Sequence, residues 1–219
     1  PDIIIIISPH SQQVAGAFSI NTSAKYESDL RQFGDLTTKM ALSGEILLPS
    51  LLHSAACADH GCQTVFINEP ILDHGSIVPL FYLLKHLPEV KIMPIGPSEF
   101  DAKTHLEFGT LLKEQIMNSN KRIAVIASGD LSHALSNDSP AGFHKNGAVF
   151  DSRTQELLLS HNTAGLLTLP TDLVSDAAEC GFRSFLILMG VLRDVNYRYE
   201  SYAYEAPYGI GYLTANFAL

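Results

Sequence analysis

The sequence predicts an α/β protein, built as a three-layer α/β/α sandwich around a mostly parallel (mixed) central sheet. Short runs of β-branched residues, such as the five isoleucines at residues 3–7, are typical of buried strands. These runs alternate along the chain with longer segments whose apolar residues recur at helical spacing. Such alternation is typical of parallel sheets that are covered by helices on both faces.

The individual elements follow from these two patterns. Apolar runs predict strands at residues 3–7, 64–67, 90–95, 122–127, 199–204 and 209–215. Helical spacing predicts helices at residues 44–59, 78–86, 99–117, 147–161 and 182–192, with a weaker pair within 163–176. The buried stripe of the first helix is predicted to be Ile46, Leu47, Leu51, Leu52 and Ala55.

Two further segments complete the fold prediction. Only EAPYG separates the last two predicted strands, so we expect them to form an antiparallel hairpin that makes the sheet mixed. Residues 19–39 are polar and predict a long loop with room for a hairpin. The chain of 219 residues suits a single domain, and we find no linker that would divide it.

Charge and composition exclude several classes of partner. The net charge of −9 argues against a nucleic-acid or anionic membrane surface, because phosphate binding requires clustered Lys and Arg. No apolar stretch approaches the ~20 residues of a membrane span, and no secretion signal precedes the first strand. Cys57, Cys62 and Cys180 are odd in number and form no C-x-x-C pair, so we expect a reduced, cytoplasmic protein.

Histidines follow apolar runs in widely separated parts of the chain. His10 ends PDIIIIISPH, where Pro9 terminates the strand, and His74 lies in LDHGSIVPL. Ligands of open α/β sheets bind outside the carboxyl ends of the strands, so these imidazoles can converge on one pocket as metal ligands or proton carriers. Asp73 could hold the His74 ring and tune its charge. The structural alternatives are a strand-end hydrogen bond for His10 and a plain turn for the DHG tripeptide.

The segment SGDLSH follows the most strand-like run of the chain and ends at His133. Ser128 and Gly129 open it, and the backbone N–H groups of its Gly, Asp and Ser residues could hold an anionic oxygen while His133 acts as a base. A helix N-cap by Asp130 or Ser132 is the structural alternative. His144 lies in the loop that follows His133 and is a candidate substrate contact.

A third candidate group opens the helix predicted at residues 182–192. Glu179 near a helix N-terminus is stabilised as an anion and suits a divalent metal, whereas a salt bridge to Arg183 is the structural alternative. Cys180 at the same terminus would have a lowered pKa. Two histidines and one carboxylate form the facial triad of non-haem Fe(II) oxygenases, and His10 and Glu179 supply two of the three.

Five motifs together resemble the class III extradiol ring-cleavage dioxygenases (the LigB-type catalytic subunit) and their relatives, the Memo-like proteins. The motifs are ISPH, LDHGSIVPL, ASGDLSHAL, AECGFRSFLILMG and YEAPYGIGYL, in family order over nearly the whole chain. The chain resembles most the dioxygenase-like domain of AmmeMemoRadiSam system proteins. The resemblance implies a LigB-like catalytic domain that opens a catechol-like aromatic ring with O2 and Fe(II).

The resemblance also assigns roles to residues. The second metal histidine of the family matches His10, and the metal glutamate matches Glu179. The acid–base histidines match His74, with Asp73 beside it, and His133, which would be the base while His74 assists oxygen activation or protonation. The first metal histidine of the family lies on an upstream strand, so we expect that residues 1–219 lack a natural N-terminal strand and the third ligand.

Two alternatives stay open beside the dioxygenase. Memo-like proteins carry a cysteine where this chain has Cys180, which leaves a Memo-like metal-binding or partner-binding protein as one alternative. The other is a hydrolase that uses Zn or another divalent metal in the same pocket. The expected partners are a small aromatic molecule and O2, and a free sheet edge leaves a homodimer open.

Overall fold

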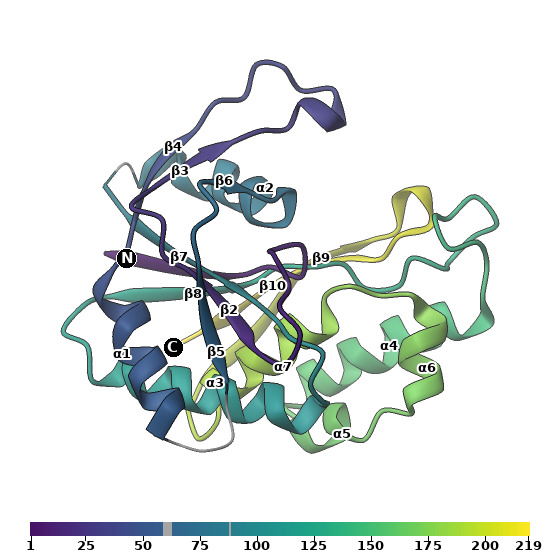
Figure 1. Cartoon of the computed structure of the whole chain (residues 1–219). Coiled ribbons are helices and arrows are strands. Elements are labelled where there is room, and N and C mark those ends of the chain that lie inside the picture. Colours follow the sequence, from purple (N-terminus) through teal and green to yellow (C-terminus); the bar gives the residue numbers. More distant parts are fainter. Residues whose placement is uncertain (59–62, 88) are drawn as a thin grey trace. The chain divides into compact units, whose positions relative to one another are not determined.

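The computed structural model describes residues 1–58, 63–87 and 89–219 (Figure 1), so Cys62 lies outside the described residues. The described chain forms two compact units. The first unit consists of Pro1–Ser128 and Arg183–Val191, and the second of Gly129–Phe182 and Leu192–Leu219. That residues 1–219 act as one catalytic domain remains a prediction.

A mixed sheet of eight strands runs through the described residues of the first unit. The strands are β1 (Ile3–Ile7), β2 (Phe18–Asn21), β3 (Lys25–Ser28), β4 (Ala41–Gly44), β5 (Thr64–Ile67), β6 (Ile71–Leu72), β7 (Lys91–Gly96) and β8 (Ile123–Ala127). β1 lies between β7 and β8 and is parallel to both. The antiparallel pairs are β2 with β7 and β3 with β4. The predicted mixed α/β sheet is confirmed.

Helices cover both faces of this sheet. They are α1 (Leu47–Ala58), α2 (His74–Leu83), α3 (Ala102–Met117) and α7 (Phe182–Val191). Short 3-10 turns lie at Arg31–Phe33, between β3 and β4, and at Leu84–His86, after α2. Because side chains alternate along a strand, Ile3, Ile5 and Ile7 of β1 pack in the core formed with α1, α3 and α7. Ile4 and Ile6 pack on the other face, in the core that contains residues of α2. The first unit therefore has the three layers that the sequence predicts.

The first helix differs from its prediction in start and orientation. It begins at Leu47 rather than at residue 44, because Gly44 ends β4 and the Glu45 carboxylate accepts the Leu47 N–H at 2.9 Å. The buried residues are Leu48, Pro49, Leu52 and Ala56. Leu47 and Leu51 are 68% and 48% exposed, so the predicted stripe is wrong for these residues.

The second unit holds three helices and a hairpin. They are α4 (Lys145–Leu159), α5 (Thr163–Leu167), α6 (Thr171–Ala177), β9 (Arg198–Glu205) and β10 (Tyr212–Ala218), with the 3-10 turn Pro207–Gly209 between the strands. The antiparallel hairpin is confirmed, but β9 and β10 form a sheet of their own. The prediction that this hairpin makes the central sheet mixed is therefore wrong. Among the described residues, every helix is too short or too polar to span a lipid bilayer.

Candidate functional site

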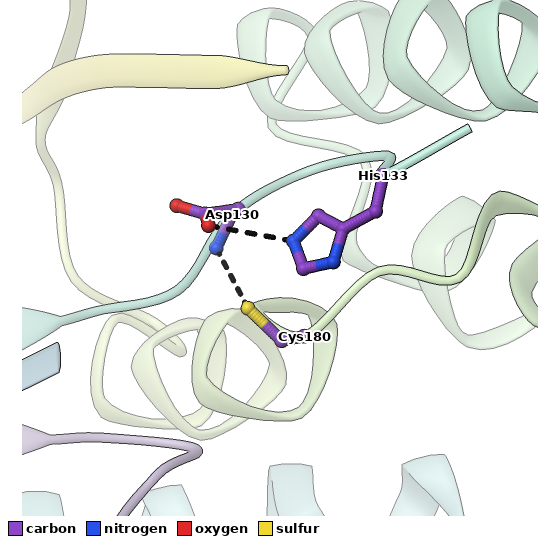
Figure 2. A group of neighbouring side chains, drawn as sticks. All are labelled: Asp130, His133 and Cys180. Atoms are coloured by element: carbon purple, nitrogen blue, oxygen red, sulfur yellow. Dashed lines mark hydrogen bonds and ion pairs between the residues drawn. The ribbon is translucent and has the colours of Figure 1, made fainter. Parts of the chain in front are cut away.

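Three side chains with metal-binding atoms meet in the second unit. Asp130 and His133 come from the loop after β8, and Cys180 comes from the segment before α7 (Figure 2). Their potential ligand atoms all lie within 4.8 Å of one another. Asp130 Oδ2 is 3.3 Å from His133 Nε2, and the Asp130 N–H donates to Cys180 Sγ at 3.1 Å. We call this group the Asp130–His133–Cys180 cluster.

Glycines allow the two backbone segments of the cluster to approach each other. Gly129 has φ +135°, a conformation that L side chains rarely adopt, and a Cβ there would collide with the Gly181 backbone. The Gly181 N–H donates to the Asp130 carbonyl at 2.9 Å. This close contact of main chains places Cys180 beside Asp130, although the two are 50 residues apart in the sequence. Gly129, predicted to bind substrate, therefore has a clear structural role.

The electrostatics of the cluster centre on His133. Its imidazole is 23% exposed, and Nε2 itself is buried. Asp130 and, second, Cys180 raise the pKa of His133 to about 10. The separation of Nε2 from Asp130 is that of an ion pair, although the contact lies outside hydrogen-bond geometry. Because Coulomb attraction depends on distance rather than on angle, we expect His133 to be protonated at neutral pH in the metal-free protein.

The position of Asp130 bears on what the cluster can do. In a nucleophilic Cys-His-Asp triad, the carboxylate holds Nδ1 and leaves Nε2 free to take the thiol proton. Here Asp130 pairs with Nε2 itself. The geometry instead suits a cation bound between the three groups.

A divalent metal fits the same donors. Tetrahedral Zn sites take nitrogen, oxygen and thiolate ligands at about 2.0–2.3 Å, which places neighbouring ligand atoms about 3.3–3.7 Å apart. The 3.3 Å between Asp130 Oδ2 and His133 Nε2 falls in this range. All three potential ligand atoms lie within 4.8 Å of one another, so binding a metal requires the side chains to move closer by about 1 Å at most. Fe(II) accepts imidazole, carboxylate and thiolate as well. The donor chemistry therefore suits the metal that the sequence predicts.

A pocket of about 830 Å³ lies in the first unit and has two of the predicted histidines in its wall. The imidazoles of His10 and His74 face each other with ring centroids 4.1 Å apart and a tilt of 32°. Phe33 packs against His74 with a centroid separation of 4.9 Å. Because both rings lie in the wall of one pocket, they can contact the same small ligand.

The structure places Asp73 as the N-cap of α2. Its carboxylate accepts hydrogen bonds from the Ser76 N–H and hydroxyl, and from the hydroxyls of Ser8 and Ser11. This cap explains why α2 begins at His74 rather than at residue 78. The hydrogen bonds orient the loop that carries His10 and the helix that carries His74. That Asp73 tunes the His74 ring remains a prediction.

The other predicted site residues have structural partners. The Ser128 hydroxyl donates to the Gly75 carbonyl at 2.6 Å. His144 is the N-cap of α4 and lies 3.7 Å from Asp176. Glu179 Oε2 accepts the Phe182 N–H at 2.5 Å at the start of α7. His10 and Glu179 belong to different units, and their pairing as metal ligands remains a prediction.

Sequence reasoning missed two contributors to the cluster. Asp130 was considered only as a backbone donor or a helix N-cap, and its D-x-x-H spacing from His133 was the available signal for its place in the cluster. Asp151 is 1% exposed and supports the same loop by accepting the Ser132 N–H at 2.8 Å and the Tyr204 hydroxyl at 2.7 Å. Nothing in the pattern around residue 151 distinguishes it from an ordinary helix-surface aspartate.

Comparisons with known proteins found a curated relative, a solved structure of the same fold and a matching family. A curated relative, Protein CA_C1420 of Clostridium acetobutylicum, is 30% identical over 225 residues, which cover 97% of this chain and 47% of the relative. The chain thus spans about half the length of that relative. The crystal structure of the uncharacterized protein JW3007 from Escherichia coli K12 has the same fold, with a TM-score of 0.66 and 17% identity over 98% of this chain and 85% of that one. Residues 1–215 match the family described as the catalytic LigB subunit of aromatic ring-opening dioxygenase, and the chain belongs to this family.

Proposed function

We propose that the protein is a metal-dependent extradiol-type dioxygenase that opens a catechol-like aromatic ring with O2. The observation that carries the proposal is the Asp130–His133–Cys180 cluster, three converging metal donors in a chain of the ring-opening family. Fe(II) is the proposed metal. A small aromatic diol and O2 are the proposed partners, and the proposed location is the cytoplasm.

The residues of the cluster would act as follows. Asp130, His133 and Cys180 would hold the metal, which when bound supplies a redox-active Lewis acid that polarises the hydroxyl oxygens of the diol. His133 would release its proton as the metal enters, because Nε2 cannot hold both. Asp130 and Cys180 together offset the positive charge of the bound ion.

His10 and His74 are proposed as proton carriers of the first unit, because their imidazoles lie in the wall of its pocket and can accept protons from a ligand bound there. The Asp73 hydrogen bonds would keep these two rings at their observed separation of 4.1 Å.

One observation favours a second candidate function. The converging donors include Cys180, and a thiolate suits Zn as well as Fe(II). A Memo-like protein or a zinc hydrolase would use the same cluster without O2. Hydrolysis would then require water activation at the metal rather than a redox change.

The test is anaerobic loading with Fe(II) or Zn, measurement of metal per protein, and O2 uptake with a panel of catechols. Stoichiometric Fe(II) with catechol-dependent O2 uptake would support the dioxygenase. Tight metal binding without O2 uptake, combined with ester or amide hydrolysis, would support the second candidate. Cys180→Ala is expected to lose the metal. Cys57→Ala is the matched control, because Cys57 is an exposed free cysteine on α1.

A further inference from the structure

The backbone before β10 is fixed against the loop that carries the cluster. The Leu131 N–H donates to the Gly211 carbonyl and the Gly211 N–H donates to the Ser132 carbonyl, each at 2.8 Å. A second anchor lies at Gly209, whose carbonyl accepts the Leu135 N–H at 3.2 Å and the Ser139 hydroxyl at 2.9 Å. Residues 208–212 are thus held in register beside Asp130 and His133.

The tyrosines at the two ends of this segment differ from their neighbours in the hairpin. The Tyr204 hydroxyl donates to Asp151, and the Tyr202 hydroxyl donates to Glu200. The hydroxyls of Tyr208 and Tyr212, in contrast, make no hydrogen bond with any residue of the described chain. They are available to a ligand.

Tyr212 is the member of this pair that lies near the cluster. It is 38% exposed, and burial, followed by the negative charges of Asp130 and Cys180, raises its pKa. A tyrosine phenol is ordinarily protonated at neutral pH, and Tyr212 can donate a hydrogen bond to an oxygen held at the cluster because its neighbour Gly211 is hydrogen-bonded to Leu131 and Ser132 of the cluster loop. Tyr208 contributes a smaller electrostatic effect on Tyr212.

Tyr208 has a strained backbone and almost no burial. Its φ of 57° and ψ of 20° place it in the left-handed region, and its side chain is 84% exposed. This region is unfavourable for a residue with a Cβ atom and open to glycine. Packing does not explain a large aromatic residue at this position, because little of its side chain is covered. Strain that persists in this way is typical of ligand-binding segments.

We propose that Tyr212 is a substrate-contacting residue of the Asp130–His133–Cys180 site that donates its phenolic hydrogen to an oxygen of an aromatic diol, with the Tyr208 ring against the same ligand. This inference rests on the proposed function. It deepens that function by assigning recognition of the diol to the β9–β10 hairpin. A neutral phenol donor favours an oxygen that carries negative charge, as a diol does after losing a proton.

The test uses 4-nitrocatechol, a chromophoric diol, titrated anaerobically into the whole protein loaded with Fe(II). Tyr212→Phe is expected to weaken binding about tenfold, the loss that follows from one hydrogen bond to a charged group. Metal content and Tm are expected to stay unchanged. Tyr202→Phe is the matched control, because it removes a hydroxyl from the same hairpin without affecting residues 208–212.

A second variant separates recognition from folding. Tyr208→Gly is expected to raise Tm, because it removes the left-handed strain at an exposed position, and to weaken 4-nitrocatechol binding several-fold. A residue with a purely structural role is not expected to give a higher Tm together with weaker 4-nitrocatechol binding when it is replaced. Equal binding by the wild type and Tyr212→Phe, or loss of metal from Tyr212→Phe, would overturn the proposal. A wild-type protein that holds metal but binds no 4-nitrocatechol would instead refute the proposed function and the diol contact with it.

Discussion

Replacing Asp151 tests how the cluster loop is supported. Asp151→Leu removes the acceptor of two hydrogen bonds, one from the Ser132 N–H and one from the Tyr204 hydroxyl. Asp151→Asn has nearly the same shape and keeps an oxygen that can accept from Ser132. The comparison therefore isolates the hydrogen bonds from the volume of the side chain.

The magnitude follows from the burial of the two donors. Ser132 is fully buried, so its unpaired N–H would cost about 1–3 kcal/mol. Tyr204 is 38% exposed, and its hydroxyl can form a hydrogen bond with water instead, so the loss of its bond to Asp151 would cost about 1 kcal/mol. Burial raises the pKa of Asp151, and the relief of that desolvation offsets part of the loss. We expect Asp151→Leu to lower the free energy of unfolding by about 2–3 kcal/mol and Asp151→Asn by about 1 kcal/mol or less.

The assay is urea unfolding of the metal-free protein, followed by circular dichroism and tyrosine fluorescence. Tyr204→Phe alone should cost about 1 kcal/mol, and it should cost nothing further in the Asp151→Leu background, because the bond is already absent. Asp138→Leu is the control, since Asp138 is an exposed aspartate in the loop between β8 and α4. An Asp151→Leu protein within about 0.5 kcal/mol of the wild type would refute this reasoning.

Three further predictions concern the cluster. The raised pKa of His133 stabilises the metal-free fold fully below pH 6.5, and this stability is lost as the pH rises through about 10. The urea concentration at the midpoint of unfolding should therefore fall over this pH range, and Asp130→Asn should make the fall smaller. Gly129→Ala should abolish metal binding and lower the free energy of unfolding by at least about 2 kcal/mol. The control Gly142→Ala, at φ +71° in open space, should bind metal normally and lower the free energy of unfolding by about 1 kcal/mol. Glu179→Gln keeps an acceptor for the α7 cap, so loss of metal from this variant would support the predicted ligand role of the carboxylate, and full metal content would leave it only the cap.

Local patterns were enough to predict most elements. The β-branched run at Ile3–Ile7 is a strand because its residues favour extended backbone and can be buried on both faces. The α3 helix was predicted from apolar spacing, and its N-cap Asp101 moves its start only to Ala102. The side of α1 that faces the core was predicted incorrectly, because neighbouring apolar positions on a helix compete for burial and only the packed partner decides between them.

In the candidate site, too, some features were predictable from the sequence and others depended on tertiary structure. The sequence by itself indicated His10, His74, His133, Glu179 and Cys180 as candidates, since polar residues after apolar runs are visible in any linear pattern. The placement of Cys180 beside Asp130 depended on tertiary structure, because these two residues are 50 positions apart and meet only where the backbones of Gly129 and Gly181 approach each other. The support from Asp151 and the placement of Tyr212 depended on it as well. Contacts of this kind are non-local, and their energies come from burial and hydrogen bonds that exist only once the chain has folded.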